Sequence, residues 1–294
     1  MSTESIDPRY RDIDQWPTRQ AIEAMLDGQI AAVTSVRSQI DALARAADAA
    51  SERLLEGGRL VYVGAGTSGR IAVQDGVELV PTYDFPAERL VYVLAGGMAA
   101  LSASVEGAED DIADAERQMT AAGITDKDVV IGVAASGITP FTVAALRLAR
   151  LARALTIGIT NNQDAPLTRE AEVGLVADTG SELVAGSTRM KAGTAQKTIL
   201  NVLSTMIMLR CGFIYNGLMV NMRASNQKLR KRAIEMVQEL SGKSQDQAEA
   251  ALEQSDYDIK LAVLLALGCE RSKAASALSS SRNNLRAALQ ALGL

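Results

Sequence analysis

The stretch LVYVGAGTSGR, Leu60–Arg70, decides the fold class of this chain. A run rich in β-branched and aromatic residues ends at a glycine, and Gly64, Gly66 and Gly69 follow the pattern G-x-G-x-x-G. Between a strand and a helix, this pattern is typical of a loop that holds a phosphate group at a helix N-terminus. Dinucleotide-binding enzymes carry the same pattern, so the question is which phosphate the loop holds.

Strand-like and helix-like runs alternate around this stretch. Apolar runs typical of buried strands occur at Leu60–Val63, Leu90–Leu94, Val129–Val133, Ala154–Ile159 and Val173–Val176. Helical periodicity lies between them, most clearly at Ile71–Val80, Asp111–Ala122 and Phe141–Arg153. The alternation predicts an α/β fold with a doubly wound, Rossmann-like parallel sheet, whose ligands bind beyond the carboxyl ends of the strands.

Along the chain, helices are expected both before the first strand and after the last one. Pro17–Glu56 has the apolar spacing of two helices, which end at a glycine pair before the first strand. Longer helices are expected at Met190–Cys211 and Val220–Leu240, and the remainder has the pattern of three or four short helices without a strong internal repeat. We therefore expect an N-terminal helical segment at residues 1–56, an α/β domain at 57–240 and a small helical bundle at 241–294.

Composition limits the class of protein. The chain has 294 residues, a formal net charge of −5 and 48% hydrophobic residues, which is typical of a soluble globular protein. No basic tract points to nucleic acid, and no apolar run is long enough to span a bilayer. The N-terminal stretch MSTESIDPRYRDIDQW lacks the apolar core of a signal peptide. We expect a cytoplasmic protein that binds neither nucleic acid nor membrane.

The sequence contains no histidine, which restricts its chemistry. Any general acid or base must be Asp, Glu, Lys, Tyr or Cys, and a Ser-His-Asp hydrolase is excluded. A histidine-ligated metal site is excluded too, and Cys211 and Cys269 do not have the spacing of metal ligands. No metal is expected.

The glycine loop lacks the partner that a dinucleotide requires. A nicotinamide site expects Asp or Glu at the end of the second strand, where it binds the ribose hydroxyls. Here that strand ends in VLAGG, residues 93–97, and Glu88 lies at its opposite end. Thr67 and Ser68 instead place hydroxyls at the start of the next helix, where they suit a phosphate monoester.

A second loop has the same chemistry. AASGITP, Ala134–Pro140, follows a predicted strand and opens a helix, with Ser136 and Thr139 on either side of Gly137. Thr67 or Thr139 alone is equally explained as a helix N-cap. Two such loops together favour a clamp on one phosphate, formed by Gly66, Thr67, Ser68, Ser136, Gly137 and Thr139.

Longer motifs carry a family resemblance. GRLVYVGAGTSGR, EGAEDD, DVVIGVAASGITP and GSTRMKAGTAQKTILNVLST resemble the N-acetylmuramic acid 6-phosphate etherases of the sugar isomerase (SIS) domain superfamily. The resemblance runs from TESIDPRYRDID near the N-terminus to NNLRAALQAL near the C-terminus. It implies a SIS domain that binds a sugar phosphate, a C-terminal bundle similar to ubiquitin-associated domains, and a homodimer. It also implies cofactor-independent cleavage of N-acetylmuramic acid 6-phosphate to N-acetylglucosamine 6-phosphate and D-lactate, a step of cell-wall sugar recycling.

Elimination gives the ether bond a route to cleavage. Once the sugar ring opens, the C1 aldehyde acidifies the C2 proton, so a base removes it, lactate leaves C3 and water adds to the unsaturated aldehyde. The resemblance assigns Glu78, in DGVELVPTY, as the acid that assists lactate departure and Glu109, in EGAEDD, as the base at C2. A solvated carboxylate at an acidic helix start is the plain alternative for Glu109.

Further substrate contacts are expected in TGSELVAGSTRMK. Related isomerases often carry a catalytic glutamate just before this helix start, so the resemblance suggests that Glu182 assists at C1 or C2. Ser187 and Lys191, with Thr188 and Arg189, would close the site or bind the neighbouring subunit. A helix cap at Ser187 with surface cations is the alternative.

The chain also departs from the family pattern. Ile138 stands where the S-G-R-T-P loop of the family has arginine, and VELVPT at residues 77–82 stands where the family has SECPPT. Two other functions therefore stay open. One is an aldose–ketose phosphosugar isomerase, which shares the phosphate grip and proton abstraction at C2. The other is a non-catalytic phosphosugar-binding regulator.

Overall fold

A computed structural model describes residues 3–294 and contains a five-stranded parallel sheet. The strand order is β2–β1–β3–β4–β5, and every neighbouring pair is parallel. The strands are β1 Leu60–Gly64, β2 Leu90–Leu94, β3 Val129–Val133, β4 Leu155–Thr160 and β5 Val173–Val176. The order reverses between the adjacent strands β1 and β3, which confirms the predicted doubly wound sheet.

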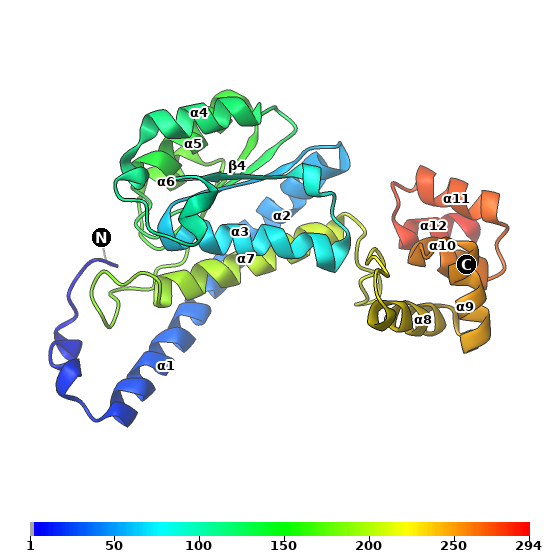
Figure 1. Ribbon diagram of the computed structural model, residues 1–294, viewed down its shortest axis with the longest axis horizontal. Helices are drawn as coiled ribbons and strands as arrows, with labels where there is room; N and C mark the ends of the chain where they lie inside the picture. The colour runs from blue at the N-terminus through cyan, green and yellow to red at the C-terminus, as the bar shows by residue number, and fades with distance from the viewer. Residues whose placement is uncertain (1–2) are drawn as a thin grey trace. The chain divides into compact units, whose positions relative to one another are not determined.

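Helices cover both faces of the sheet (Figure 1). On one face, α5 packs against β1, β3 and β4, and α4 and α6 lie beside it. On the opposite face, α2 packs against β3, β4 and β5. The bounds of these helices are Ile40–Leu55 for α2, Ile112–Ala122 for α4, Pro140–Leu151 for α5 and Pro166–Glu170 for α6.

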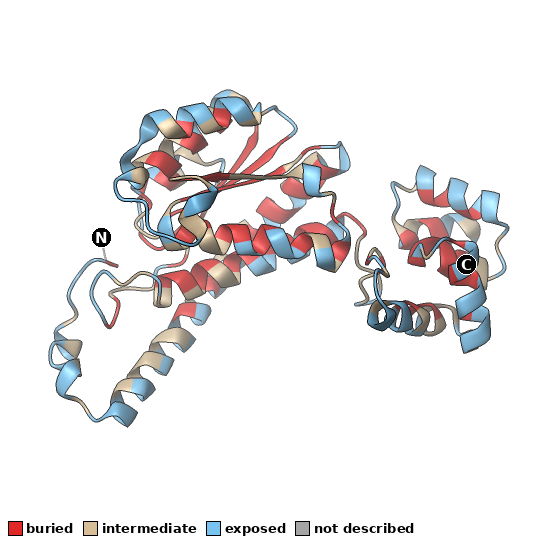
Figure 2. Ribbon diagram, in the orientation of Figure 1, coloured by how far each residue is buried: buried red, intermediate tan, exposed pale blue. Residues whose placement is uncertain are grey.

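The strands are apolar along their length because both faces of the sheet are covered. Val61, Val63 and Val130 point to the face of α5, where they join Phe141 and Leu146 in one buried cluster. Figure 2 shows the strands buried throughout most of the sheet. The predicted strands are confirmed, with shifts of one residue at three of their ends.

A hydrogen-bond network around the buried Asp75 joins α3 (Gly66–Tyr83) to α7 (Lys191–Arg210). Asp75 accepts hydrogen bonds from Tyr62 Oη at 3.0 Å, Asn201 Nδ2 at 2.7 Å and Ser204 Oγ at 3.1 Å. Burial raises the pKa of Asp75, and these hydrogen bonds act against that rise. The network fixes the helix that begins at the glycine loop.

Two predicted helix starts need correction. Helix α3 begins at Gly66, earlier than the expected Ile71, so Thr67 and Ser68 lie in its first turn. The helix expected from Val220 begins only at Gln227, as α8 (Gln227–Ser241), because the Asn226 side chain caps it. The N-terminal helices, α1 (Thr18–Ser35) and α2, match their prediction. Within residues 3–294, no helix has the length and apolar character needed to cross a membrane.

The chain divides into two compact units. The first contains the described residues up to Val77 together with Glu88–Thr205, and it includes the whole sheet. The second contains Glu78–Ala87 and Met206–Leu294. The expected three-part division of the sequence stays a prediction.

The second unit contains a helical bundle with its own core. After α8 follow α9 (Gln245–Gln254), α10 (Ile259–Ala266), α11 (Arg271–Ser280) and α12 (Leu285–Leu292). The connections within α9–α10 and α11–α12 are alike, because Asp256 and Tyr257 have φ of 55° and 64°, and Arg282 and Asn283 have φ of 52° and 57°. These two helix pairs therefore share one turn geometry.

Candidate active site

Two glycines allow strand β1 to approach helix α3 closely. A Cβ on Gly64 would lie 2.8 Å from Gly69 Cα, so a larger residue at this position would separate the two elements. Gly66 has a φ of +52°, and no other part of the described chain lies within 4 Å of its Cβ position. The space beside Gly66 is therefore open, next to the unpaired backbone N–H groups that begin a helix.

The loop after β3 has a similar construction. Gly137 has a φ of +69°, and a Cβ there would lie 2.6 Å from Thr160 Oγ1 and closer still to Ala165 Cβ. The Thr139 side chain precedes α5 but makes no capping hydrogen bond within the described chain. The explanation of Thr139 as a simple helix cap is therefore not supported, and its hydroxyl is available to a ligand.

A cavity of about 510 Å³ lies where the two loops meet, beside the strands at which the sheet order reverses. Six predicted site residues line it: Gly66, Thr67, Ser68, Glu109, Ser136 and Thr139. The rest of its wall consists of Glu4, Ala65, Asp110, Ala135, Ile138, Pro140 and Thr188. The structure thus brings hydroxyl groups, two helix N-termini and the predicted base to one cavity.

The charged groups of the cavity wall are all acidic. They are Glu4, Glu109 and Asp110, and no lysine or arginine of residues 3–294 lines the cavity. Ile138, where the resemblance leads us to expect an arginine, is 46% exposed and lines both this cavity and a neighbouring one of about 330 Å³. A phosphate bound here would therefore depend on hydroxyls and helix N-termini, and each helix dipole stabilises an anion by about 0.3–1 kcal/mol.

Glu109 lies in the short 3₁₀ turn Ala108–Asp110, directly before α4. The side chain that caps α4 is that of Asp111, which accepts a hydrogen bond from Asp114 N at 2.8 Å. Glu109 is exposed and lines the cavity. Asp111 therefore caps α4, and the Glu109 carboxylate is not needed for that purpose.

Glu78, the predicted acid, is not part of this cavity wall. It is exposed on α3, twelve residues after Gly66. At a rise of about 1.5 Å per residue, this separation corresponds to about 18 Å along the helix. The glycine loop therefore opens α3, and Glu78 lies in its C-terminal half, five residues before the helix ends at Tyr83.

The residues predicted before α7 are engaged in holding that helix. Glu182 is 1% exposed, and its two carboxylate oxygens accept hydrogen bonds from Lys191 N at 3.0 Å and Ala192 N at 2.9 Å. Lys191 Nζ donates to the Thr179 carbonyl at 2.7 Å. Glu182, Lys191 and Ser187 do not line the cavity, whereas Thr188 does. A role for these three residues toward substrate stays a prediction.

Two acidic residues of the cavity were missed by sequence reasoning. Asp110 follows Glu109 directly and shares its motif, so the motif already contained this signal. Glu4 lies in the N-terminal segment, which packs against a residue 159 positions away: Asn162 Nδ2 donates to Thr3 Oγ1 at 2.9 Å. Only the folded chain reveals that Glu4 belongs to the site.

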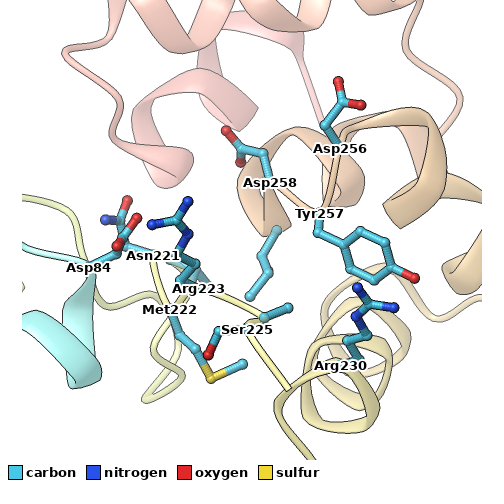
Figure 3. A pocket seen from close by; sticks show the side chains of 12 residues that line it. Asp84, Asn221, Met222, Arg223, Ser225, Arg230, Asp256, Tyr257 and Asp258 are labelled. Atoms are coloured by element: carbon cyan, nitrogen blue, oxygen red, sulfur yellow. The ribbon is translucent and has the colours of Figure 1, made fainter. Parts of the chain in front are cut away.

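A second cavity, of about 410 Å³, lies in the second unit and contains none of the predicted site residues. Figure 3 shows its charged side chains, most of which serve the bundle itself. The Arg230 guanidinium lies over the Tyr257 ring, 5.1 Å from its centroid, and Asp256 pairs with Arg271 at 3.0 Å. The Asp258 side chain caps α10. Among the described residues, no cluster of three or more acidic or cysteine side chains is arranged to hold a metal ion.

Comparison with known proteins first defines a class. A family model for the glucokinase regulatory protein N-terminal SIS domain matches residues 40–150, and one for the C-terminal lid domain of that protein matches residues 216–264. The structure of a phosphoheptose isomerase from Francisella tularensis has the same fold, with a TM-score of 0.52 and 18% identity over 65% of this chain and 98% of that one. Residues 40–150, which include both hydroxyl-rich loops, are therefore similar to a SIS domain, and the sheet has the fold of a phosphosugar isomerase.

Relatives that match over nearly their full length define the family. N-acetylmuramic acid 6-phosphate etherase from Deinococcus radiodurans is 46% identical over 295 residues, covering 99% of this chain and 97% of the relative. The protein of that name from Salmonella typhimurium is 40% identical over 291 residues, which cover 99% of this chain and 98% of the relative. The chain belongs to the N-acetylmuramic acid 6-phosphate etherase family, which confirms the resemblance predicted from its motifs.

Proposed function

We propose that the protein cleaves the D-lactyl ether of N-acetylmuramic acid 6-phosphate, giving N-acetylglucosamine 6-phosphate and D-lactate in cytoplasmic cell-wall sugar recycling. The observation that carries this proposal is the identity of 46% with an etherase along nearly the whole chain. The cavity supports it, because phosphate-type loops and a carboxylate share one wall there. Cys211 and Cys269 are not joined by a disulfide, which fits a reducing compartment.

The loops after β1 and β3 hold the phosphate on C6 of the ring-opened sugar. Thr67, Ser68, Ser136 and Thr139 donate their hydroxyls, and the backbone N–H groups that begin α3 and α5 complete the grip. Glu109 takes the C2 proton, which the C1 aldehyde has made acidic. The C2–H electron pair forms the C2=C3 double bond, and the C3–O bond to lactate breaks. Water then adds to the double bond, with its hydroxyl at C3 and its proton at C2.

The proton for the departing lactate oxygen comes from Glu78 of the partner subunit. The position of Glu78 about 18 Å along α3 from the glycine loop supports this arrangement, because a proton donor must come within about 3 Å of its acceptor. Its exposure leaves it accessible to a second copy of the chain. Each site of a symmetric dimer then contains Glu109 from one subunit and Glu78 from the other.

An apolar stripe on α1 supports the homodimer. Ile22, Leu26, Ile30 and Val33 are 51%, 57%, 66% and 47% exposed, and they recur at helical spacing on one face. Apolar faces of this kind on soluble proteins mark sites of association. Sedimentation of the protein at micromolar concentration should give twice the mass of one chain, and Leu26→Glu should shift it toward the monomer.

The proposal is tested by incubating the purified protein with N-acetylmuramic acid 6-phosphate and measuring D-lactate. Release of D-lactate by the wild type, lost in Glu109→Gln, is expected. Solvent deuterium should also appear at C2 of the product sugar, because the proton at C2 comes from solvent. Wild-type protein that releases no more D-lactate than Glu109→Gln contradicts the etherase assignment.

A regulator is the second candidate, because both matching domain models carry the name of glucokinase regulatory protein. A regulator binds a phosphosugar without turning it over. Binding of N-acetylmuramic acid 6-phosphate with full recovery of intact substrate would favour the regulator. Conversion of an aldose phosphate to its ketose without D-lactate would favour the isomerase.

A further inference from the structure

The N-terminal segment is anchored to the phosphate loop. Thr3 is fully buried, and Asn162 Nδ2 donates hydrogen bonds both to Thr3 Oγ1 and to the Ala135 carbonyl, each at 2.9 Å. Ala135 directly precedes Ser136 of the second loop. Asn162 is itself 4% exposed. One buried side chain therefore holds the chain start and the phosphate loop together.

Glu4 follows this anchor and lines the cavity. Its Oε2 lies 3.3 Å from the position that a Cβ on Gly186 would occupy, so the carboxylate lies beside the loop that leads to α7. Within residues 3–294, Glu4 has no hydrogen bond or ion pair. The nearby Asp7 differs, because it pairs with Arg9 at 2.7 Å. Glu4 thus offers an acceptor that no group of the described chain uses.

We propose that Glu4 determines sugar specificity by accepting hydrogen bonds from uncharged donors of the substrate, its hydroxyl or amide N–H groups. A carboxylate repels a phosphate dianion, so Glu4 contacts the sugar and leaves the phosphate to the two loops. An ionised carboxylate can only accept hydrogen bonds, and the hydroxyl and amide N–H groups of a sugar can donate them. This inference rests on the proposed function and deepens it, because it assigns recognition of the sugar to a residue outside the SIS motifs.

Calorimetric titration of the full chain with two probes tests this role. Glu4→Ala should bind N-acetylglucosamine 6-phosphate roughly 10- to 100-fold more weakly than wild type, the range expected for a hydrogen bond to a charged group. It should bind inorganic phosphate as tightly as wild type, or more tightly, because a repelling charge is gone. The matched control is Glu106→Ala, an exposed glutamate that does not line the cavity, which should leave both affinities unchanged.

The two probes separate recognition from simple charge repulsion. If Glu4 only repels anions, Glu4→Ala binds both probes more tightly, and that result overturns the proposal. Equal affinity of Glu4→Ala and wild type for N-acetylglucosamine 6-phosphate also overturns it. Thr3→Val keeps the Glu4 carboxylate but removes the hydroxyl that anchors the segment. Like Glu4→Ala, it should lower the affinity for N-acetylglucosamine 6-phosphate.

Failure of this inference differs from failure of the proposed function. Wild-type protein that binds N-acetylglucosamine 6-phosphate but releases no D-lactate contradicts the etherase activity, and a binding loss in Glu4→Ala still supports the role of Glu4. Wild-type protein that releases D-lactate, with unchanged sugar phosphate affinity in Glu4→Ala, contradicts the role of Glu4 alone.

Discussion

Mixed dimers of two inactive variants should recover activity if each site takes Glu109 from one subunit and Glu78 from the other. Glu78 lies twelve residues beyond Gly66 on one helix, or about 18 Å along its axis. Proton transfer needs a heavy-atom separation of about 2.6–3.2 Å. We therefore expect a substrate held by the glycine loop to be out of reach of Glu78 from the same subunit.

The expected recovery follows from symmetry. A dimer of one Glu78→Gln chain and one Glu109→Gln chain has one site with both glutamates and one site with neither. The purified mixed dimer should therefore have about half of the wild-type activity, because one of two equivalent sites is intact. Loss of a general acid or base typically lowers the rate by about 10²- to 10⁴-fold, so each variant alone should fall below about 1%.

The assay uses two affinity tags to isolate mixed dimers and measures D-lactate release. A mixed dimer that is as inactive as its parents would refute the shared site. The reciprocal pair, wild type with the double variant Glu78→Gln/Glu109→Gln, provides the matched control. In a shared site this pair is inactive, because every site lacks one glutamate. If both glutamates come from one chain, the control pair keeps half of the activity instead.

Three further changes test the fold around the site and the bundle. Gly137→Ala should lower the free energy of unfolding by about 1–3 kcal/mol, because Gly137 has a positive φ and lies close to neighbouring side chains. It should also weaken the binding of inorganic phosphate. Urea unfolding measures the first effect and calorimetry the second, and wild-type values in both would contradict the reasoning. Burial lowers the pKa of Lys260 from 10.5 to about 8. Between pH 8 and pH 10.5 the unfolded chain therefore binds more protons than the folded chain, so the stability of the second unit should rise by roughly 3 kcal/mol across this range. Hydrogen exchange of α10 amides, corrected for intrinsic rates, should show this rise in wild type and lose it in Lys260→Met; equal pH profiles would speak against it. Asp75→Ala should destabilise the first unit by about 3 kcal/mol in chemical denaturation, because the buried donors Tyr62 and Ser204 lose their acceptor and Asn201 loses its partner. Asp75→Asn keeps one acceptor oxygen and should cost less.

The sheet was predictable because its strands are buried on both faces. Burial on both faces leaves unbroken apolar runs in the sequence, and glycine follows the first of them where β1 approaches α3. The loops were predictable for the same reason, since each follows such a run and opens a helix. The start of α8 was not, because Val220 and Met222 are buried in irregular chain and imitate the apolar spacing of a helix.

The site was predictable only where its residues share a motif with the loops. Glu109 and the hydroxyls lie in local patterns, whereas Glu4 reaches the cavity through a contact between Thr3 and Asn162, which no local pattern records. Glu182 illustrates the reverse case. Its position before a helix start fits a catalytic residue and a backbone cap equally well, and only the fold shows both of its oxygens bound to amides of α7.

The charges of the cavity also orient the substrate. Within residues 3–294 the charged groups on the wall are acidic side chains, so a phosphate dianion is best placed against the two helix N-termini, where dipoles and hydroxyls offset its charge. The rest of the sugar must then extend toward the carboxylates. In the proposed reaction this orientation would place C6 at the loops and leave C1 to C3 for Glu109, as the proposed proton abstraction at C2 requires. Ile138 supplies no charge of its own, so the direction of binding depends on the helix ends and not on an arginine.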